Sequence, residues 1–140
     1  MKRAFSGTAA KGFTLIELMI AVAILAIVMG IAIPSYSQWV LKSGRAEAKG
    51  ALMQTAQALE RCFTRFSAYD NAACGVSDGQ KINSENGKYE VTVNVGSATT
   101  FSLTAAPNGG QAKDTECGSF TLTQTGARTI GGSGTVDKCW

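Results

Sequence analysis

The feature that most constrains this chain is an almost unbroken apolar run at residues 13–33. A helix rises 1.5 Å per residue, so this run measures about 30 Å, the thickness of a bilayer's hydrocarbon core. One carboxylate, Glu17, lies near its N-terminal end. A charge at mid-membrane depth costs about 2.5–3.5 kcal/mol even on lenient scales, and less near the headgroups. Two interpretations stay open: a plain anchor with a tolerated acid, or a segment whose Glu17 meets a partner when several copies pack together.

The residues before the apolar run carry Lys2, Arg3 and Lys11 and no acid. A secretory signal places its small-residue cleavage site after the apolar region. Here the small residue, Gly12, comes before it. Cleavage after Gly12 removes the basic leader and leaves Phe13 as a new N-terminus with the apolar segment intact.

This N-terminal pattern resembles the type IV prepilin signature: a basic leader ending in Gly, then Phe-Thr-Leu-Ile-Glu and an apolar run that closes at Pro34. The resemblance implies that a prepilin peptidase, which is also an N-methyltransferase, cuts between Gly12 and Phe13 and methylates the Phe13 amine. It also implies that Glu17 and Pro34 belong to the segment used in filament assembly.

Composition excludes several classes of function. The chain has 13 Lys and Arg against 10 Asp and Glu, and the leader accounts for the whole excess. A balanced mature chain lacks the basic excess of a strong nucleic-acid binder. It has no histidine and no P-loop, GxSxG, HExxH or EF-hand motif, and these absences remove the common hydrolase and zinc chemistries. We expect a protein that is not an enzyme and uses no cofactor or metal, with Asp114 and Glu116 as solvated loop acids.

Four cysteines follow the apolar run: Cys62, Cys74, Cys117 and Cys139. None forms a CxxC pair, which disfavours a zinc ribbon or a thioredoxin-like motif. An even count behind an export segment fits disulfides formed outside the cytoplasm. Three connectivities are possible, and Cys62–Cys74 with Cys117–Cys139 is favoured because each pair closes a modest local loop.

The apolar run continues into a second helical segment. Pro34 removes a backbone donor and predicts a kink. Residues 35–66 show an amphipathic helical pattern, and 67–88 read as a polar, turn-rich loop. The expected buried stripe of the helix consists of Leu52, Ala56, Leu59, Phe63 and Phe66.

Beyond residue 88 the apolar period changes to two, which predicts strands with one wet face. The expected strands are residues 89–95, 101–105, 120–123 and 127–130. The fold class is therefore α+β: a long N-terminal helix packed on a small antiparallel meander of about four strands. The expected divisions are a leader (1–12), an apolar helix (13–34), its amphipathic continuation (35–66) and a globular domain (67–140).

The C-terminal half carries a second resemblance. The runs TTFSLTAAP and FTLTQTGAR, with Cys117-Gly118 and the terminal Cys139-Trp140, look like the globular domain of minor pilins of the PilE/ComP type. The resemblance implies a type IV pilin fold, in which the sheet packs on the back half of the helix and Cys117–Cys139 closes a C-terminal disulfide loop.

These resemblances imply a structural subunit, a minor pilin of a type IV pilus that supports pilus biogenesis, adhesion and twitching motility. It is expected in the inner membrane with its globular domain in the periplasm, and afterwards in the extracellular pilus. The expected partners are the prepilin peptidase, the inner-membrane assembly platform and other major and minor pilins.

Two alternatives remain, a DNA-receptor minor pilin for natural transformation and a pseudopilin of type II secretion. A DNA receptor requires a basic stripe. The candidate residues for such a stripe, interleaved with acids, are Arg61, Arg65, Lys81, Lys88, Lys113, Arg128 and Lys138.

Overall fold

The structure, a computed structural model, describes residues 12–140. Residues 1–11, which hold most of the predicted leader with its three basic side chains, lie outside the described residues. The chain divides into two compact units, residues 1–38 and 39–140. Each unit is considered by itself.

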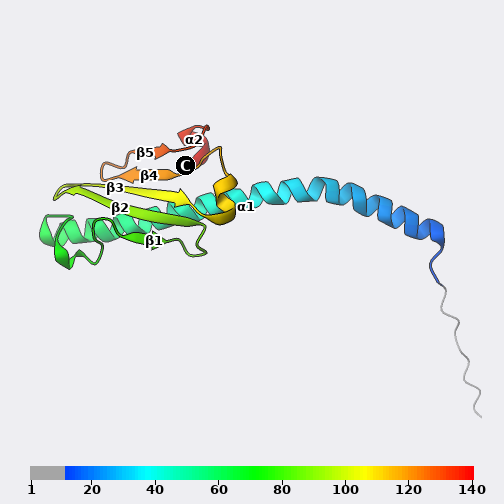
Figure 1. Ribbon diagram of the computed structural model, residues 1–140, viewed down its shortest axis with the longest axis horizontal. Coiled ribbons are helices and arrows are strands. Elements are labelled where there is room, and N and C mark those ends of the chain that lie inside the picture. Colours follow the sequence, from blue (N-terminus) through cyan, green and yellow to red (C-terminus); the bar gives the residue numbers. More distant parts are fainter. Residues whose placement is uncertain (1–11) are drawn as a thin grey trace, which may run out of the picture. The chain divides into compact units, whose positions relative to one another are not determined.

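One helix, α1 (Leu15–Phe66), forms the first half of the chain (Figure 1). It continues through Pro34, whose carbonyl accepts a hydrogen bond from the Ser37 hydroxyl at 2.9 Å. The kink expected at Pro34 stays a prediction. The helix ends where expected, because Ser67 adopts a left-handed backbone conformation with φ 54°. A left-handed residue directly after the last turn is a common way to stop a helix.

The first unit buries none of its described side chains. Every large apolar side chain between Phe13 and Trp39 is 53–90% exposed. An 18-residue window of α1 reaches a mean hydropathy of 2.8, so by length and composition it can cross a membrane. An apolar surface of this extent needs lipid or other helices to cover it.

The second unit contains a single antiparallel sheet with strand order β1-β2-β3-β4-β5 (Figure 1). The strands are β1 (Lys81–Asn83), β2 (Tyr89–Ser97), β3 (Thr100–Pro107), β4 (Phe120–Thr123) and β5 (Arg128–Ile130). Three short helical segments complete it: η1 (Ala72–Cys74), η2 (Gly109–Lys113) and α2 (Val136–Cys139). The predicted meander is confirmed, and the described residues form five strands where about four were expected.

The additional strand, β1, lies inside the segment that the sequence predicted to be a loop. Its three residues contain one apolar side chain, Ile82, so no alternation is visible locally. Ile82 lies opposite Val91 of β2, and this pairing forms the strand. The sheet edge therefore depends on pairing with the next strand along the chain.

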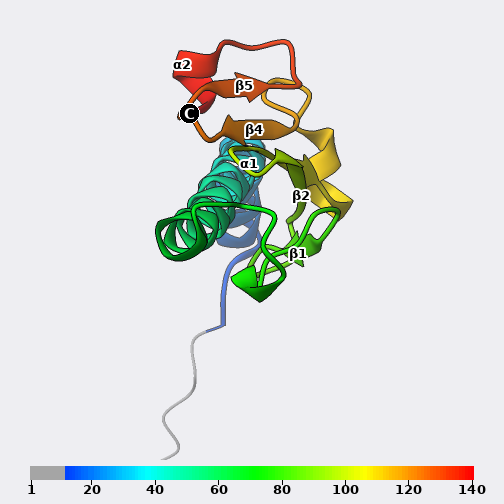
Figure 2. The same cartoon turned by 90° about the vertical axis from the view of Figure 1, so that its left-hand side faces the viewer.

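The residue 39–66 part of α1 packs on one face of this sheet (Figure 2). The alternation expected in the strands is confirmed, with Val91, Val93 and Leu103 at most 1% exposed. Full burial of such a side chain contributes about 1.5–3 kcal/mol.

The helix presents a slightly different face from the one expected. Leu52 and Leu59 are fully buried, but Phe66 is 41% exposed. Ala56 and Phe63 are only half-buried. The buried residues of α1 are Gly44, Arg45, Ala48, Leu52, Thr55, Leu59 and Cys62. At Gly44 a small residue is required, because a Cβ there would collide with the side chain of Gln111.

Candidate functional site

The N-terminal site begins with Gly12 and Phe13, which precede α1 in backbone without regular structure. Phe13 is 90% exposed. Backbone that is exposed and outside regular structure leaves the bond between these two residues accessible to a peptidase.

Thr14 and Glu17 form a capping box at the start of α1. The Thr14 N–H and hydroxyl each donate to Glu17 Oε2 at 2.9 Å, and the Glu17 N–H donates to Thr14 Oγ1 at 3.3 Å. This arrangement satisfies backbone donors that a helix N-terminus leaves free. The T-x-x-E spacing signals such a box, and sequence reasoning missed it. The other oxygen, Glu17 Oε1, makes no hydrogen bond within residues 12–140.

A buried ion cluster joins α1 to the loop before β4. Arg45 Nε donates to Asp114 Oδ2 at 2.6 Å, and Arg45 Nη2 donates to Asp114 Oδ1 at 2.8 Å. Glu116 Oε2 also accepts from Arg45 at 3.0 Å, and Lys138 pairs with the other oxygen of Glu116. Arg45 is 6% exposed and Asp114 2%, so Asp114 is not the solvated loop acid that the sequence suggested.

Burial and pairing act in opposite directions on this cluster. Burial raises the pKa of Asp114, but hydrogen bonds from Arg45 and from the Cys117 N–H outweigh it and hold the pKa below its usual value. Hydrogen bonds from Lys138 and Arg45 lower the pKa of Glu116. Both acids are therefore ionised at neutral pH, and the cluster fixes the loop to the helix.

Two disulfides add covalent links. Cys62–Cys74 joins the end of α1 to η1 with a Cα–Cα distance of 5.2 Å, and Cys117–Cys139 joins the loop before β4 to α2 at 5.7 Å. Lys49 donates to the carbonyl oxygens of Cys139 and Trp140, both at 3.1 Å. The C-terminal segment is thus held by a disulfide and by α1.

The expected basic stripe is partly neutralised. Lys81 pairs with Glu90 at 2.7 Å, and Arg128 stacks over the Trp140 ring at 5.1 Å. Lys138 pairs with Glu116 at the exposed edge of the Arg45 cluster.

Arg61 and Arg65 differ from these residues. Within residues 12–140 neither side chain makes an ion pair or hydrogen bond, and both line a cavity of about 480 Å³ beside the Cys62–Cys74 disulfide. Lys88 and Lys113 are likewise without an ion pair in the described part of the chain. Among the same residues, no three Cys, Asp or Glu side chains are grouped to hold a metal ion.

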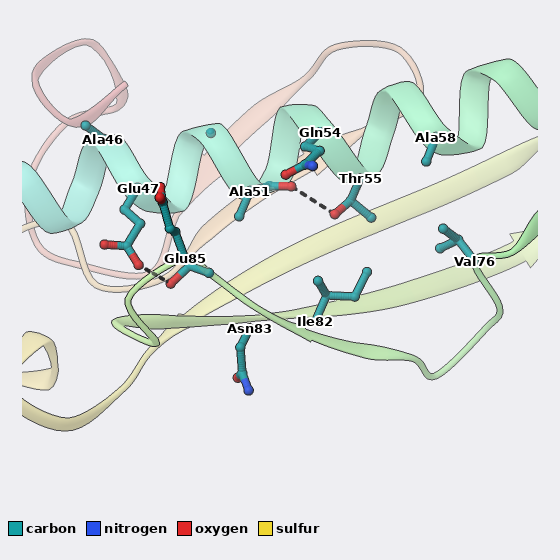
Figure 3. A pocket seen from close by; sticks show the side chains of 12 residues that line it. Ala46, Glu47, Ala51, Gln54, Thr55, Ala58, Val76, Ile82, Asn83 and Glu85 are labelled. Atoms are coloured by element: carbon teal, nitrogen blue, oxygen red, sulfur yellow. Dashed lines mark hydrogen bonds between the residues drawn. The ribbon is translucent and has the colours of Figure 1, made fainter.

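A second and larger hollow, of about 780 Å³, lies between α1 and β1 (Figure 3). Glu47 stands on the helix side, where Oε1 accepts from the Ser84 hydroxyl at 2.5 Å and from the Asn86 N–H at 2.8 Å. Partial burial raises the pKa of Glu47, but these hydrogen bonds outweigh it and lower the pKa overall. Glu85, also on the rim, is exposed.

Comparison with protein families gives two matches. A family described as type IV minor pilin ComP, DNA uptake sequence receptor, matches residues 34–121. The prokaryotic N-terminal methylation motif matches residues 8–33, a range that includes the proposed cleavage site and the start of α1.

Individual relatives agree with these matches. The fimbrial protein EcpC of Eikenella corrodens is 37% identical over 98 residues, which cover 69% of this chain and 61% of EcpC. A type IV major fimbrial protein FimA of Dichelobacter nodosus is 34% identical over 130 residues, 88% of this chain and 72% of FimA. The chain thus spans less than two thirds of the length of EcpC.

Solved structures also resemble it. A type IV pilin from Shewanella oneidensis aligns with a TM-score of 0.54 and 27% identity, covering 71% of this chain and 97% of that one. The non-core minor pilin PilV of Neisseria meningitidis aligns with a TM-score of 0.50 and 23% identity over 71% of this chain and 93% of PilV, which is a likeness of fold.

Proposed function

We propose that this chain, which belongs to the family of ComP-type minor pilins of type IV pili, is cut between Gly12 and Phe13, methylated at Phe13 and assembled through its apolar helix. The exposed apolar surface of residues 13–33 carries this proposal. Such a surface is stable in lipid before assembly and against other apolar helices afterwards.

Glu17 supplies the charged group that takes part in assembly. Inside a bundle of apolar helices, an unpaired carboxylate is costly. Cleavage creates a cationic amine on Phe13, and methylation leaves that amine charged at neutral pH. The capping box occupies Oε2 of Glu17 and leaves Oε1 available to accept from the amine of the same or an adjoining subunit. Pairing with a neighbour sets the axial register of the incoming subunit.

The compartments follow from the same features. The apolar helix supports residence in the inner membrane before assembly, and the two disulfides support a globular unit in the oxidising periplasm. The partners are the prepilin peptidase, the assembly platform and other pilins. Because the relatives reported above are fimbrial proteins, a pilus subunit is favoured over a type II secretion pseudopilin.

Intact mass of the mature chain tests processing. The expected mass corresponds to residues 13–140 with one added methyl group, and Gly12→Glu is expected to leave the full-length protein in the membrane. A start elsewhere in the chain would refute the processing scheme.

A Glu17→Val variant tests assembly. It is expected to be processed and to reside in the membrane, but to be depleted from sheared filaments. Thr14→Ala is the matched control, because it removes the capping hydroxyl and keeps the carboxylate. Normal incorporation of Glu17→Val would show that the carboxylate is only a tolerated acid.

DNA reception is the second candidate function, favoured by the description of the matching family. Arg61 and Arg65 are the side chains most open to phosphate, because they share a cavity and have no ion pair within residues 12–140. The balanced charge of the mature chain predicts weak, sequence-independent binding at most. A gel shift at physiological salt tests whether the chain is a DNA receptor. Sub-micromolar binding with a preference for one short sequence would assign that role if the Arg61→Ala/Arg65→Ala variant loses the binding.

A further inference from the structure

The hollow between α1 and β1 is a groove on the surface of the globular unit (Figure 3). Ala51 and Ala58 of the helix line one side, and Val76 and Ile82 line the other. The side beyond Ile82 is a sheet edge, because β1 is the outermost strand. This groove therefore combines apolar walls with an edge that no other strand of residues 12–140 covers.

Gly50 lies in the groove wall and is exposed. A glycine inside a helix is destabilising relative to alanine. Nothing within residues 12–140 requires it, because a Cβ at Gly50 would meet no atom within 4 Å there apart from the nearby backbone of its own helix. Gly44 is different, since a Cβ there would collide with the side chain of Gln111. The room at Gly50 is open to a partner from outside the chain.

Acidic residues lie at the groove, and basic residues lie at the C-terminal end of α1. Glu47 and Glu85 stand at the groove, and Glu85 makes no ion pair or side-chain hydrogen bond within residues 12–140. At the C-terminal end of the helix, Arg61 and Arg65 are equally without an ion pair in the described chain. Phe66 beside them is 41% exposed. One copy thus presents an acidic, apolar groove and a basic, aromatic end that is complementary to it.

We propose that the groove around Gly50 binds the Arg61–Phe66 end of α1 of a second copy of this chain. Phe66 packs against the apolar walls, and the two arginines face the carboxylates of the rim. Such a contact joins different surfaces of the two copies, and a contact of this kind that does not close into a ring continues as an open filament. The inference rests on the proposed function as a pilus subunit.

Photo-crosslinking of the full-length processed protein, in membranes and in sheared filaments, tests the contact. A photoreactive residue replaces Gly50, and the control places it at Met53, which is exposed but does not line the groove. The expected product is a covalent dimer from position 50 only. Peptide mapping is expected to find the crosslink within residues 61–66 of the second copy.

Charge reversal separates pairing from misfolding. Glu85→Lys and Arg65→Glu each put like charges in contact and are expected to lower the dimer yield about fivefold. The double variant, Glu85→Lys/Arg65→Glu, restores complementarity between copies and is expected to restore the yield. Gly50→Leu fills the groove and is expected to abolish binding, whereas Met53→Leu leaves it unchanged.

Each other outcome overturns the proposal. A crosslink from position 50 to a different protein assigns the groove to that partner, and no crosslink, or no rescue by the double variant, removes the contact. Failure of the proposed function looks different, because the chain would then be missing from sheared filaments whatever the membrane crosslink shows.

Discussion

Replacing Asp114 by asparagine keeps the shape of the buried ion cluster and removes its charge. Asp114 is 2% exposed and holds Arg45 through two hydrogen bonds. Breaking a buried pair by removing one partner costs about 3–5 kcal/mol, since the other charge stays buried. Glu116 still accepts from Arg45 at 3.0 Å, so we expect the lower end, about 3 kcal/mol. That is a large share of the roughly 5–15 kcal/mol that stabilises a domain.

Urea unfolding of the processed full-length protein in a mild detergent measures this cost. Trp140 is the reporter, because its ring packs edge-to-face on Phe120 and its indole N–H donates to the Thr129 carbonyl. A Trp39→Phe background removes the other tryptophan. At ordinary urea slopes, the midpoint is expected to fall by about 1–3 M.

The pH dependence provides an independent check. The pKa of Asp114 is lower in the folded protein than in the unfolded chain, where it is about 3.9. The contribution is therefore fully present above the unfolded value and is lost as the pH falls toward the folded one. The difference in stability between the wild type and Asp114→Asn is expected to shrink below about pH 4.

A matched control isolates burial. Glu116→Gln removes a carboxylate whose side chain is 38% exposed and is expected to lower the urea midpoint much less than Asp114→Asn does. The double variant Arg45→Met/Asp114→Leu removes both buried charges and is expected to be more stable than Asp114→Asn. An Asp114→Asn protein as stable as the wild type, or a double variant less stable than the single one, would refute the reasoning.

Three further predictions concern stability. Ser67→Gly relieves a left-handed backbone conformation and is expected to raise the midpoint of thermal unfolding, with a gain of about 0.5–1 kcal/mol; no gain would mean that the serine is not strained. Cys117→Ser/Cys139→Ser opens a bridge between residues 22 apart and is expected to cost about 3–4 kcal/mol in urea unfolding, and a much smaller loss would contradict the chain-entropy account of this bridge. Gly44→Ala forces a Cβ into Gln111 and is expected to destabilise by about 1–3 kcal/mol in the same assay, and a neutral result would show that Gln111 moves freely.

Local periodicity in the sequence was sufficient for the long helix and for most of the sheet. The apolar run at residues 13–33 predicts a helix, because a helix satisfies the hydrogen bonds of its own backbone in lipid. The alternation around Val91 and Leu103 assigns each side chain to one face, because strand geometry has a period of two. The capping box of Thr14 and Glu17 was equally readable, and it is the local signal that was overlooked.

Contacts between distant residues were decided by the tertiary structure alone. Arg45 and Asp114 are 69 residues apart, and neither carries a local sign that the other will neutralise it. Strand β1 has one apolar side chain and forms because β2 offers it a partner, and the face of α1 that is buried depends on how the sheet approaches it. The periodicity of apolar residues depends on the geometry of one helix or strand. Burial and pairing depend also on the element that packs against it, and the local sequence of the first element does not identify that second element.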